Sequence, residues 1–162
     1  MISIWLTPSK KDECYLQNII NELASEHQAP VFSPHMTLLS PVDLNENELH
    51  SVFSNVSKEF EPLNVTLAGI NHSPNIWKTV FVELEESLEL ITLQQQIASQ
   101  LSSTPLYEFL PHISLIYKDL PQEKKEEIIR KLAVRNSYKM DKITAMRTGP
   151  HVEKWERLAE IN

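Results

Sequence analysis

The chain has 162 residues, of which 41% are hydrophobic and 23% are charged, the balance of one soluble globular domain with a substantial core. Its formal net charge of −7, from 22 acidic and 15 basic residues, argues against a broad electrostatic surface for nucleic acid or anionic membrane. The single cysteine, Cys14, excludes an internal disulfide, and having only two glycines excludes a glycine-rich phosphate loop.

The first predicted elements are a strand and a helix that meet after Pro8. Residues 2–8 predict a strand that stops at this proline, and Ser9 followed by Asp12 has the spacing of a helix capping box. The helix has apolar residues at the positions of a half-buried face: Leu16, Ile19, Ile20 and Leu23.

The middle of the chain predicts a strand, a helix and a pair of strands. Residues 34–41 form a short β-rich run between prolines, and Asp43 opens a helix whose apolar residues again recur at helical spacing. The runs 63–70 and 77–84 are β-rich and are separated by the turn-like "NHSPN".

The last part of the chain predicts two helices and three strands. Apolar residues recur at helical spacing over 86–102, and 111–117 is a β-rich run. Pro121 fits the first turn of a helix, and 137–148 and 152–161 have the composition of closing strands. The order β-α-β-α-β-β-α-β-α-β-β contains no linker, so we expect a single α+β domain over the whole chain.

The hexapeptide "PHMTLL" around His35 is repeated as "PHISLI" around His112. Because side chains alternate along a strand, each motif presents an imidazole and a hydroxyl on one face, His35 with Thr37 and His112 with Ser114. Each motif is a strand followed by an amphipathic helix, which predicts two related lobes. If the lobes face one another, the four side chains share one groove.

This set of groups suits displacement at a cyclic phosphodiester. One imidazole can deprotonate water while the other protonates the departing oxygen, since the unperturbed pKa of histidine is about 6.5. The hydroxyls of Thr37 and Ser114 can donate hydrogen bonds to the non-bridging oxygens. We expect no metal and no cofactor, because neither motif brings a carboxylate or a second histidine at metal-ligand spacing.

The pairing of the two motifs carries this interpretation. A single His-x-Ser/Thr tripeptide arises often by chance, and a lone histidine is more often structural than catalytic. Of the six histidines, only His35 and His112 have a hydroxyl residue two positions later. Residues 28–42 contain no charged side chain, which fits a site for an anion but also fits a buried strand.

These residues resemble the 2H phosphoesterase superfamily, and within it the plant and yeast cyclic phosphodiesterases. The resemblance rests on "ISIWLTPS", "PVFSPHMTLLSP", "WKTVFVEL", "LPHISLIY" and "VEKWERLAEI". It implies two lobes, each an antiparallel sheet flanked by helices, with an active-site cleft between them. The implied reactions open ADP-ribose 1″,2″-cyclic phosphate to ADP-ribose 1″-phosphate and nucleoside 2′,3′-cyclic phosphates to 2′-phosphates, with tRNA splicing as the source of the former.

By this resemblance, His35 and His112 are the catalytic residues and Thr37 and Ser114 bind the phosphate. The chain departs from the plant enzyme at Phe109, where that enzyme has tyrosine, and Tyr107 is a candidate substitute for the lost hydroxyl. The paired cysteines of the plant enzyme are also missing, so no redox control by a disulfide is expected.

Aromatic residues supply the remaining candidates for substrate binding. Trp77 at the start of a strand can stack on a base or ribose, and Trp5 is a further cleft candidate by the resemblance. We assign Phe81 and Trp155 to the core. Lys78 has the charge to screen phosphate, but strand alternation places it with the core-facing residues of 77–84.

Two alternatives remain open: an RNA-end enzyme of the superfamily (a 2′-5′ ligase-like protein or a 3′-exonuclease) and a module that binds a nucleotide without turnover. The acidic net charge disfavours the former, and retention of both motifs disfavours the latter. The N-terminus is not a signal peptide and no apolar run approaches the ~20 residues of a membrane span. We therefore expect a cytoplasmic monomer acting on a nucleotide-derived small molecule, with RNA ends as the other possible partner.

Overall fold

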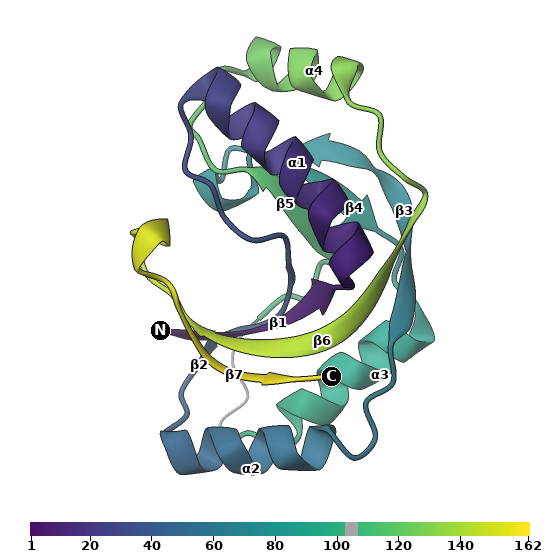
Figure 1. The fold of residues 1–162 in the computed structure, drawn as a ribbon, viewed down its shortest axis with the longest axis vertical. Coiled ribbons are helices and arrows are strands. Elements are labelled where there is room, and N and C mark those ends of the chain that lie inside the picture. The colour runs from purple at the N-terminus through teal and green to yellow at the C-terminus, as the bar shows by residue number, and fades with distance from the viewer. Residues whose placement is uncertain (103–106) are drawn as a thin grey trace.

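The computed structural model describes residues 1–102 and 107–162 and contains the elements in the predicted order (Figure 1). The strands are β1 (Ile2–Pro8), β2 (Met36–Val42), β3 (Leu63–His72), β4 (Val80–Leu84), β5 (His112–Ile116), β6 (Ser137–Arg147) and β7 (Glu156–Ile161). The helices are α1 (Lys10–His27), α2 (Glu46–Val56), α3 (Leu88–Ala98) and α4 (Gln122–Lys131), with short 3₁₀ helices η1 (Ile76–Lys78) and η2 (Val152–Lys154). The predicted α+β class is confirmed.

All strand pairs are antiparallel, and in the described part of the chain their order is β2-β1-β6-β3-β4-β5, with β7 paired to β6. β3 changes partner along its length: residues 63–66 pair with β6, and the stretch from Leu67 to His72 pairs with β4. β3 and β6 therefore join two lobes, one built on β2, β1, β6 and β7 and the other on β3, β4 and β5.

Each lobe is covered by two helices. α1 packs against β5, and α4 packs against β3 and β4. α2 and α3 pack against each other and against β7 and β2, at the opposite end of the molecule (Figure 1). Each lobe thus contains one histidine motif and the helix that follows it, as the repeat predicts.

The hydrophobic core explains why the two histidine motifs point where they do. Leu16 and Ile20 of α1 are fully buried and belong to one continuous cluster that runs through both lobes. Burial of apolar surface contributes on the order of 25 cal/mol per Å². The same cluster takes up the residues that alternate with the motif side chains, all of which are fully buried: Met36, Leu38, Ile113 and Leu115.

The helix expected from Asp43 begins three residues later. Asn45 is its N-cap, and its side chain accepts hydrogen bonds from the amides of Asn47 and Glu48. The Glu48 carboxylate in turn accepts from the Asn45 amide at 2.9 Å, which completes a capping box.

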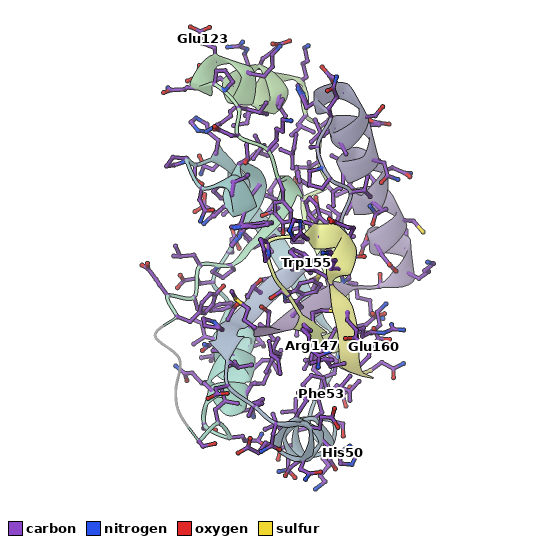
Figure 2. The ribbon with its side chains drawn as sticks, turned by 90° about the vertical axis from the view of Figure 1, so that its left-hand side faces the viewer. His50, Phe53, Glu123, Arg147, Trp155 and Glu160 are labelled. Atoms are coloured by element: carbon purple, nitrogen blue, oxygen red, sulfur yellow. The ribbon has the colours of Figure 1, made fainter. Side chains whose placement is uncertain are left out.

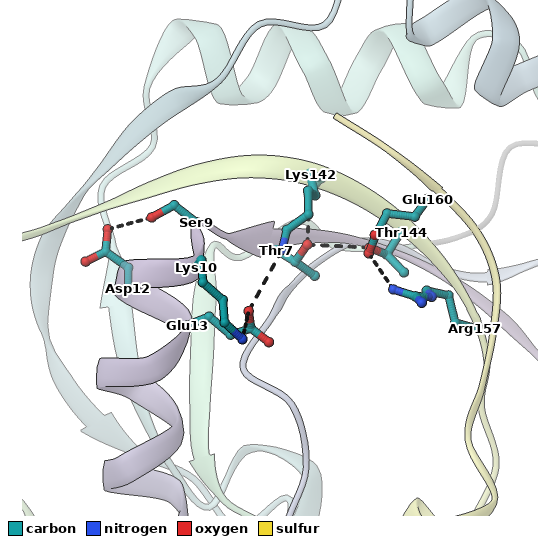
Figure 3. Close-up of polar contacts among 9 residues, drawn as sticks. All are labelled: Thr7, Ser9, Lys10, Asp12, Glu13, Lys142, Thr144, Arg157 and Glu160. Atoms are coloured by element: carbon teal, nitrogen blue, oxygen red, sulfur yellow. Dashed lines mark hydrogen bonds and ion pairs between the residues drawn. The ribbon is translucent and has the colours of Figure 1, made fainter.

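The predicted capping box at Ser9 does not form, because Asp12 has other partners. Its carboxylate accepts hydrogen bonds from the amide of Lys139 and from Arg135, each at 2.8 Å, and so ties α1 to the start of β6. Figure 3 shows the remaining contact, from the Ser9 hydroxyl to Asp12 at 3.4 Å.

Polar contacts also hold β7 to β6. Thr144 and Arg157 both donate to one carboxylate oxygen of Glu160, at 3.3 and 3.1 Å (Figure 3). The contact from Thr144 crosses between the two strands and supplements their antiparallel pairing, whereas the contact from Arg157 lies within β7.

The strand expected over 77–84 begins only at Val80. Residues 76–78 form η1, and Thr79 separates it from the strand. The Asn75 side chain caps η1 by accepting from the Trp77 amide at 2.9 Å. Strand alternation therefore does not extend to Trp77 and Lys78. Within residues 1–102 and 107–162, no helix is long and apolar enough to cross a bilayer.

Candidate active site

The two motif histidines are anchored in the same way. The Nδ1 of His35 lies 2.7 Å from the carbonyl oxygen of Ser33, and the Nδ1 of His112 lies 2.7 Å from that of Leu110. A carbonyl oxygen can only accept, so Nδ1 carries the proton in both rings. Each Nε2 is left as the nitrogen that can take or give a proton in chemistry.

Both rings line one cavity of about 520 Å³ that receives side chains from both lobes. It brings together seven of the eight site residues selected from the sequence: Trp5, His35, Thr37, Trp77, Tyr107, His112 and Ser114. The further lining residues are Met1, Ser3, Ser40, Asn75, Lys78, Tyr117, Thr148, Gly149, Pro150 and Trp155. Phe109 does not line the cavity and packs against the hydrophobic core instead.

The hydroxyl partners of the histidines lie on the same cavity. Ser114 is buried, and its Oγ donates to the carbonyl oxygen of Trp77 at 2.9 Å. The Tyr107 hydroxyl donates to the carbonyl oxygen of Thr37 at 3.2 Å, and burial raises the pKa of Tyr107 to about 12. Tyr107 is therefore a protonated donor near neutral pH that ties its segment to β2.

Aromatic rings hold His35 in place. The Trp5 indole stacks on its imidazole with ring centroids 3.6 Å apart and an interplanar angle of 12°. Trp155 approaches the same imidazole edge-on at 6.3 Å, and its Nε1 donates to the carbonyl oxygen of Gly149 at 2.8 Å. Phe32 also meets this imidazole edge-on at 6.3 Å, so one hydrogen bond and three aromatic contacts fix the position of the His35 ring.

Trp155 and Tyr117 are lining residues that the sequence interpretation missed. Trp155 is half-buried on the cavity rather than inside the core, because β7 begins one residue later and strand alternation does not apply to it. It lies between the two ends of the molecule that Glu123 and His50 mark in Figure 2. Tyr117 follows the last residue of β5 and meets the Trp77 ring edge-on at 5.3 Å.

Burial lowers the pKa of both catalytic candidates. For His35, burial together with the neighbouring His112 lowers the pKa from 6.5 to about 4. For His112, burial and then the positive charge of Lys78 lower the pKa, and Glu83 partly opposes them. Both imidazoles therefore favour the neutral form near neutral pH in the free protein.

The charged groups around the cavity have one sign. Among the described lining residues there is no aspartate or glutamate, and Lys78 is the only lysine or arginine. In the same part of the chain, no group of three or more histidine, cysteine, aspartate or glutamate residues is placed to hold a metal ion. The cavity thus presents proton-transfer groups, hydroxyl donors and one cation, which suits an anionic ligand.

Solved structures with this fold cover almost the whole chain. Escherichia coli LigT complexed with 3′-AMP has a TM-score of 0.64 at 14% identity, over 98% of this chain and 95% of that one. A Thermus thermophilus protein has a TM-score of 0.64 at 14% identity, over 99% and 96%. The fold is that of the 2H phosphoesterases, as the sequence resemblance predicts.

Sequence comparison identifies the family. The chain is 21% identical to the cyclic phosphodiesterase of Arabidopsis thaliana over 169 residues, which cover 99% of this chain and 93% of that protein. Residues 1–161 match the family described as cyclic phosphodiesterase-like protein, so the chain belongs to that family and is a phosphodiesterase.

Proposed function

We propose that this protein hydrolyses cyclic phosphates of nucleotide derivatives without a metal ion, using His35 and His112 as the general acid–base pair. The substrates would be ADP-ribose 1″,2″-cyclic phosphate and nucleoside 2′,3′-cyclic phosphates, which give the 1″-phosphate and the 2′-phosphates. The observation that supports it most is the matched pair of imidazoles on one cavity. Each has its Nδ1 on a carbonyl oxygen, no described residue hydrogen-bonds to its Nε2, and no carboxylate is among the described lining residues.

The reaction balances with the groups on the cavity. One imidazole Nε2 takes a proton from water as the water oxygen bonds to phosphorus. The bond from phosphorus to one ring oxygen breaks, and the other imidazole, in its protonated form, gives its proton to that oxygen. The product is a phosphate monoester with a free hydroxyl, and proton exchange with solvent restores both histidines. Thr37 donates a hydrogen bond to a non-bridging oxygen, and Ser114 does so when its hydroxyl turns away from the Trp77 carbonyl, which accepts its single proton in the free protein.

The aromatic lining supports a nucleotide-derived substrate. Trp77 has 38% of its surface exposed, which leaves ring surface available for a base or ribose, whereas one face of Trp5 is covered by His35. The relatives agree in ligand class, since LigT structures hold 3′-AMP, NADP⁺ and ATP.

The test is turnover in EDTA of ADP-ribose 1″,2″-cyclic phosphate and the four nucleoside 2′,3′-cyclic phosphates. We expect hydrolysis by the wild type, loss of at least ~10³-fold in His35→Ala and in His112→Ala, and full activity in His50→Ala, an exposed histidine on α2. Nucleotide binding without turnover in the wild type would instead indicate a binding module.

A further inference from the structure

Hydrogen bonds to Ser73, Ser114 and Lys118 hold the backbone segment that carries Lys78. The Ser73 hydroxyl donates to the Lys78 carbonyl at 2.6 Å, and Ser114 donates to the carbonyl of the preceding Trp77. The next residue, Thr79, is buried, and its hydroxyl donates to the Lys118 carbonyl at 2.8 Å. The backbone that carries this lysine is therefore tied to the same strand as His112.

The Lys78 ammonium and the His112 imidazole both contact the ring of Phe81. Its Nζ is 4.3 Å from the centroid of the Phe81 ring, and the Phe81 ring meets the His112 ring edge-on at 5.5 Å. The positive charge of Lys78 contributes to lowering the pKa of His112, so the two groups interact electrostatically.

Within the described residues, no carboxylate forms an ion pair with the Lys78 ammonium. Glu83 and Glu108 act on Lys78 only through longer-range charge, and the Glu83 carboxylate accepts a hydrogen bond from Asn71 at 2.6 Å. A cation on a cavity whose described lining has no carboxylate has its charge available for a ligand.

We infer that Lys78 is a third catalytic residue, whose ammonium binds a non-bridging oxygen on the His112 side and stabilises the second negative charge that develops as the phosphate ring opens. This role rests on the proposed function. The cyclic diester has one negative charge, and addition of hydroxide brings the pentacoordinate phosphorus group toward two before the leaving oxygen receives its proton. The monoester product also carries two charges above a pH of about 6. A fixed cation therefore favours the transition state and the product over the substrate.

The experiment compares the wild type, Lys78→Met, Lys78→Arg and Lys11→Met, the last removing an exposed lysine outside the cavity. Methionine keeps an aliphatic contact with Phe81 and removes only the charge. We measure kcat and KM for a nucleoside 2′,3′-cyclic phosphate, the inhibition constant of the 2′-phosphate product, and the thermal midpoint.

We expect Lys78→Met to lower kcat by about 10- to 100-fold with KM changed less than about threefold, and to weaken product binding by about tenfold, as for loss of one charge-assisted hydrogen bond. Lys78→Arg should recover most of kcat, and all four proteins should share one thermal midpoint. If the wild type is active and Lys78→Met stays within about twofold of it in kcat and in product inhibition, Lys78 has no catalytic role. If the wild type is inactive, the proposed function itself is wrong and this role falls with it.

Discussion

At the scale of single residues, the two catalytic candidates differ in what surrounds them. His35 is 7% exposed and lies against an indole face, whereas His112 is more open and lies beside a cation. The shared anchor on Nδ1 fixes the tautomer in both, so the difference lies in the environment of the ring. The hydrogen bond to Ser33 holds only the Nδ1 of His35, and stacking with Trp5 restricts the remaining rotation of the imidazole about that bond.

Replacing Trp5 tests whether this stack positions His35. An offset or parallel ring pair contributes about 0.5–1.5 kcal/mol, so Trp5→Leu should lower kcat by about tenfold with little change in KM. Trp5→Phe keeps a ring against the imidazole and should retain at least roughly a third of kcat. Equal kcat values of the leucine and phenylalanine variants would show that the Trp5 ring only fills space. Thermal melting of each variant checks that it is folded.

The pH dependence follows from the two histidine pKa values. The proposed mechanism needs one imidazole neutral and the other protonated, so kcat/KM should peak between the two pKa values of the free protein, whichever ring is the base. Burial places the pKa of His35 at about 4, and burial with Lys78 places that of His112 below 6.5.

We therefore expect a bell-shaped profile of kcat/KM between about pH 4 and 9 with its maximum below pH 6.5. The falling limb reports loss of the last proton from the pair as pH rises. In Lys78→Met this limb should move to higher pH, because the imidazolium of His112 no longer faces the ammonium. A maximum near about pH 8 would contradict the assignment of buried, neutral-leaning imidazoles.

At the scale of elements, strand alternation carried most of the sequence prediction of the site. It places His35 with Thr37, and His112 with Ser114, because the residues between them are taken up by a core that both lobes share. It fails at Lys78, where the chain forms a 3₁₀ turn before the strand, since such a turn has no period of two.

The helix predictions are limited by polar contacts at the starts of the helices. Apolar spacing locates α1 and α2, and α1 begins directly after Ser9 as predicted, whereas the capping box of Asn45 places the start of α2 three residues after Asp43. Asp12 bonds to β6 rather than to its own helix, a contact between residues more than a hundred positions apart. No local pattern in the sequence indicates such a partner.

The Asp12 contact predicts which element loses stability first. Its carboxylate is mostly buried and accepts from the Lys139 amide and from Arg135, which is partly exposed. Asp12→Ala leaves the amide without its partner and should lower the free energy of unfolding by about 2 kcal/mol in urea titrations. Glu13→Ala, which removes only pairs at 3.7 and 3.9 Å, should change it by less than about 0.5 kcal/mol. Both variants should keep wild-type kcat; an equal loss of stability in the two would refute the anchoring role of Asp12.

At the scale of the whole molecule, charge is distributed unevenly between the surface and the cavity. The chain carries a net charge of −7, yet no carboxylate is among the described residues that line the cavity. Long-range attraction of an anion is therefore absent, and recognition of phosphate is left to groups within the cavity. We therefore expect this arrangement to favour a small cyclic phosphate over a polyanion, which the net negative charge of the chain repels.

The length of the substrate provides the corresponding test. An RNA-end enzyme gains affinity from each phosphate that contacts a cation, so a longer strand binds better and with a steep salt dependence. Here Lys78 is the one lysine or arginine among the described residues that line the cavity. A short RNA oligonucleotide ending in a 2′,3′-cyclic phosphate should therefore have a kcat/KM no higher than that of the mononucleotide. The slope of log kcat/KM against log salt should stay below about 1 in magnitude for both. A roughly tenfold preference for the oligonucleotide with a steeper slope would place the protein among the RNA-end enzymes, with a basic track for the strand elsewhere on its surface.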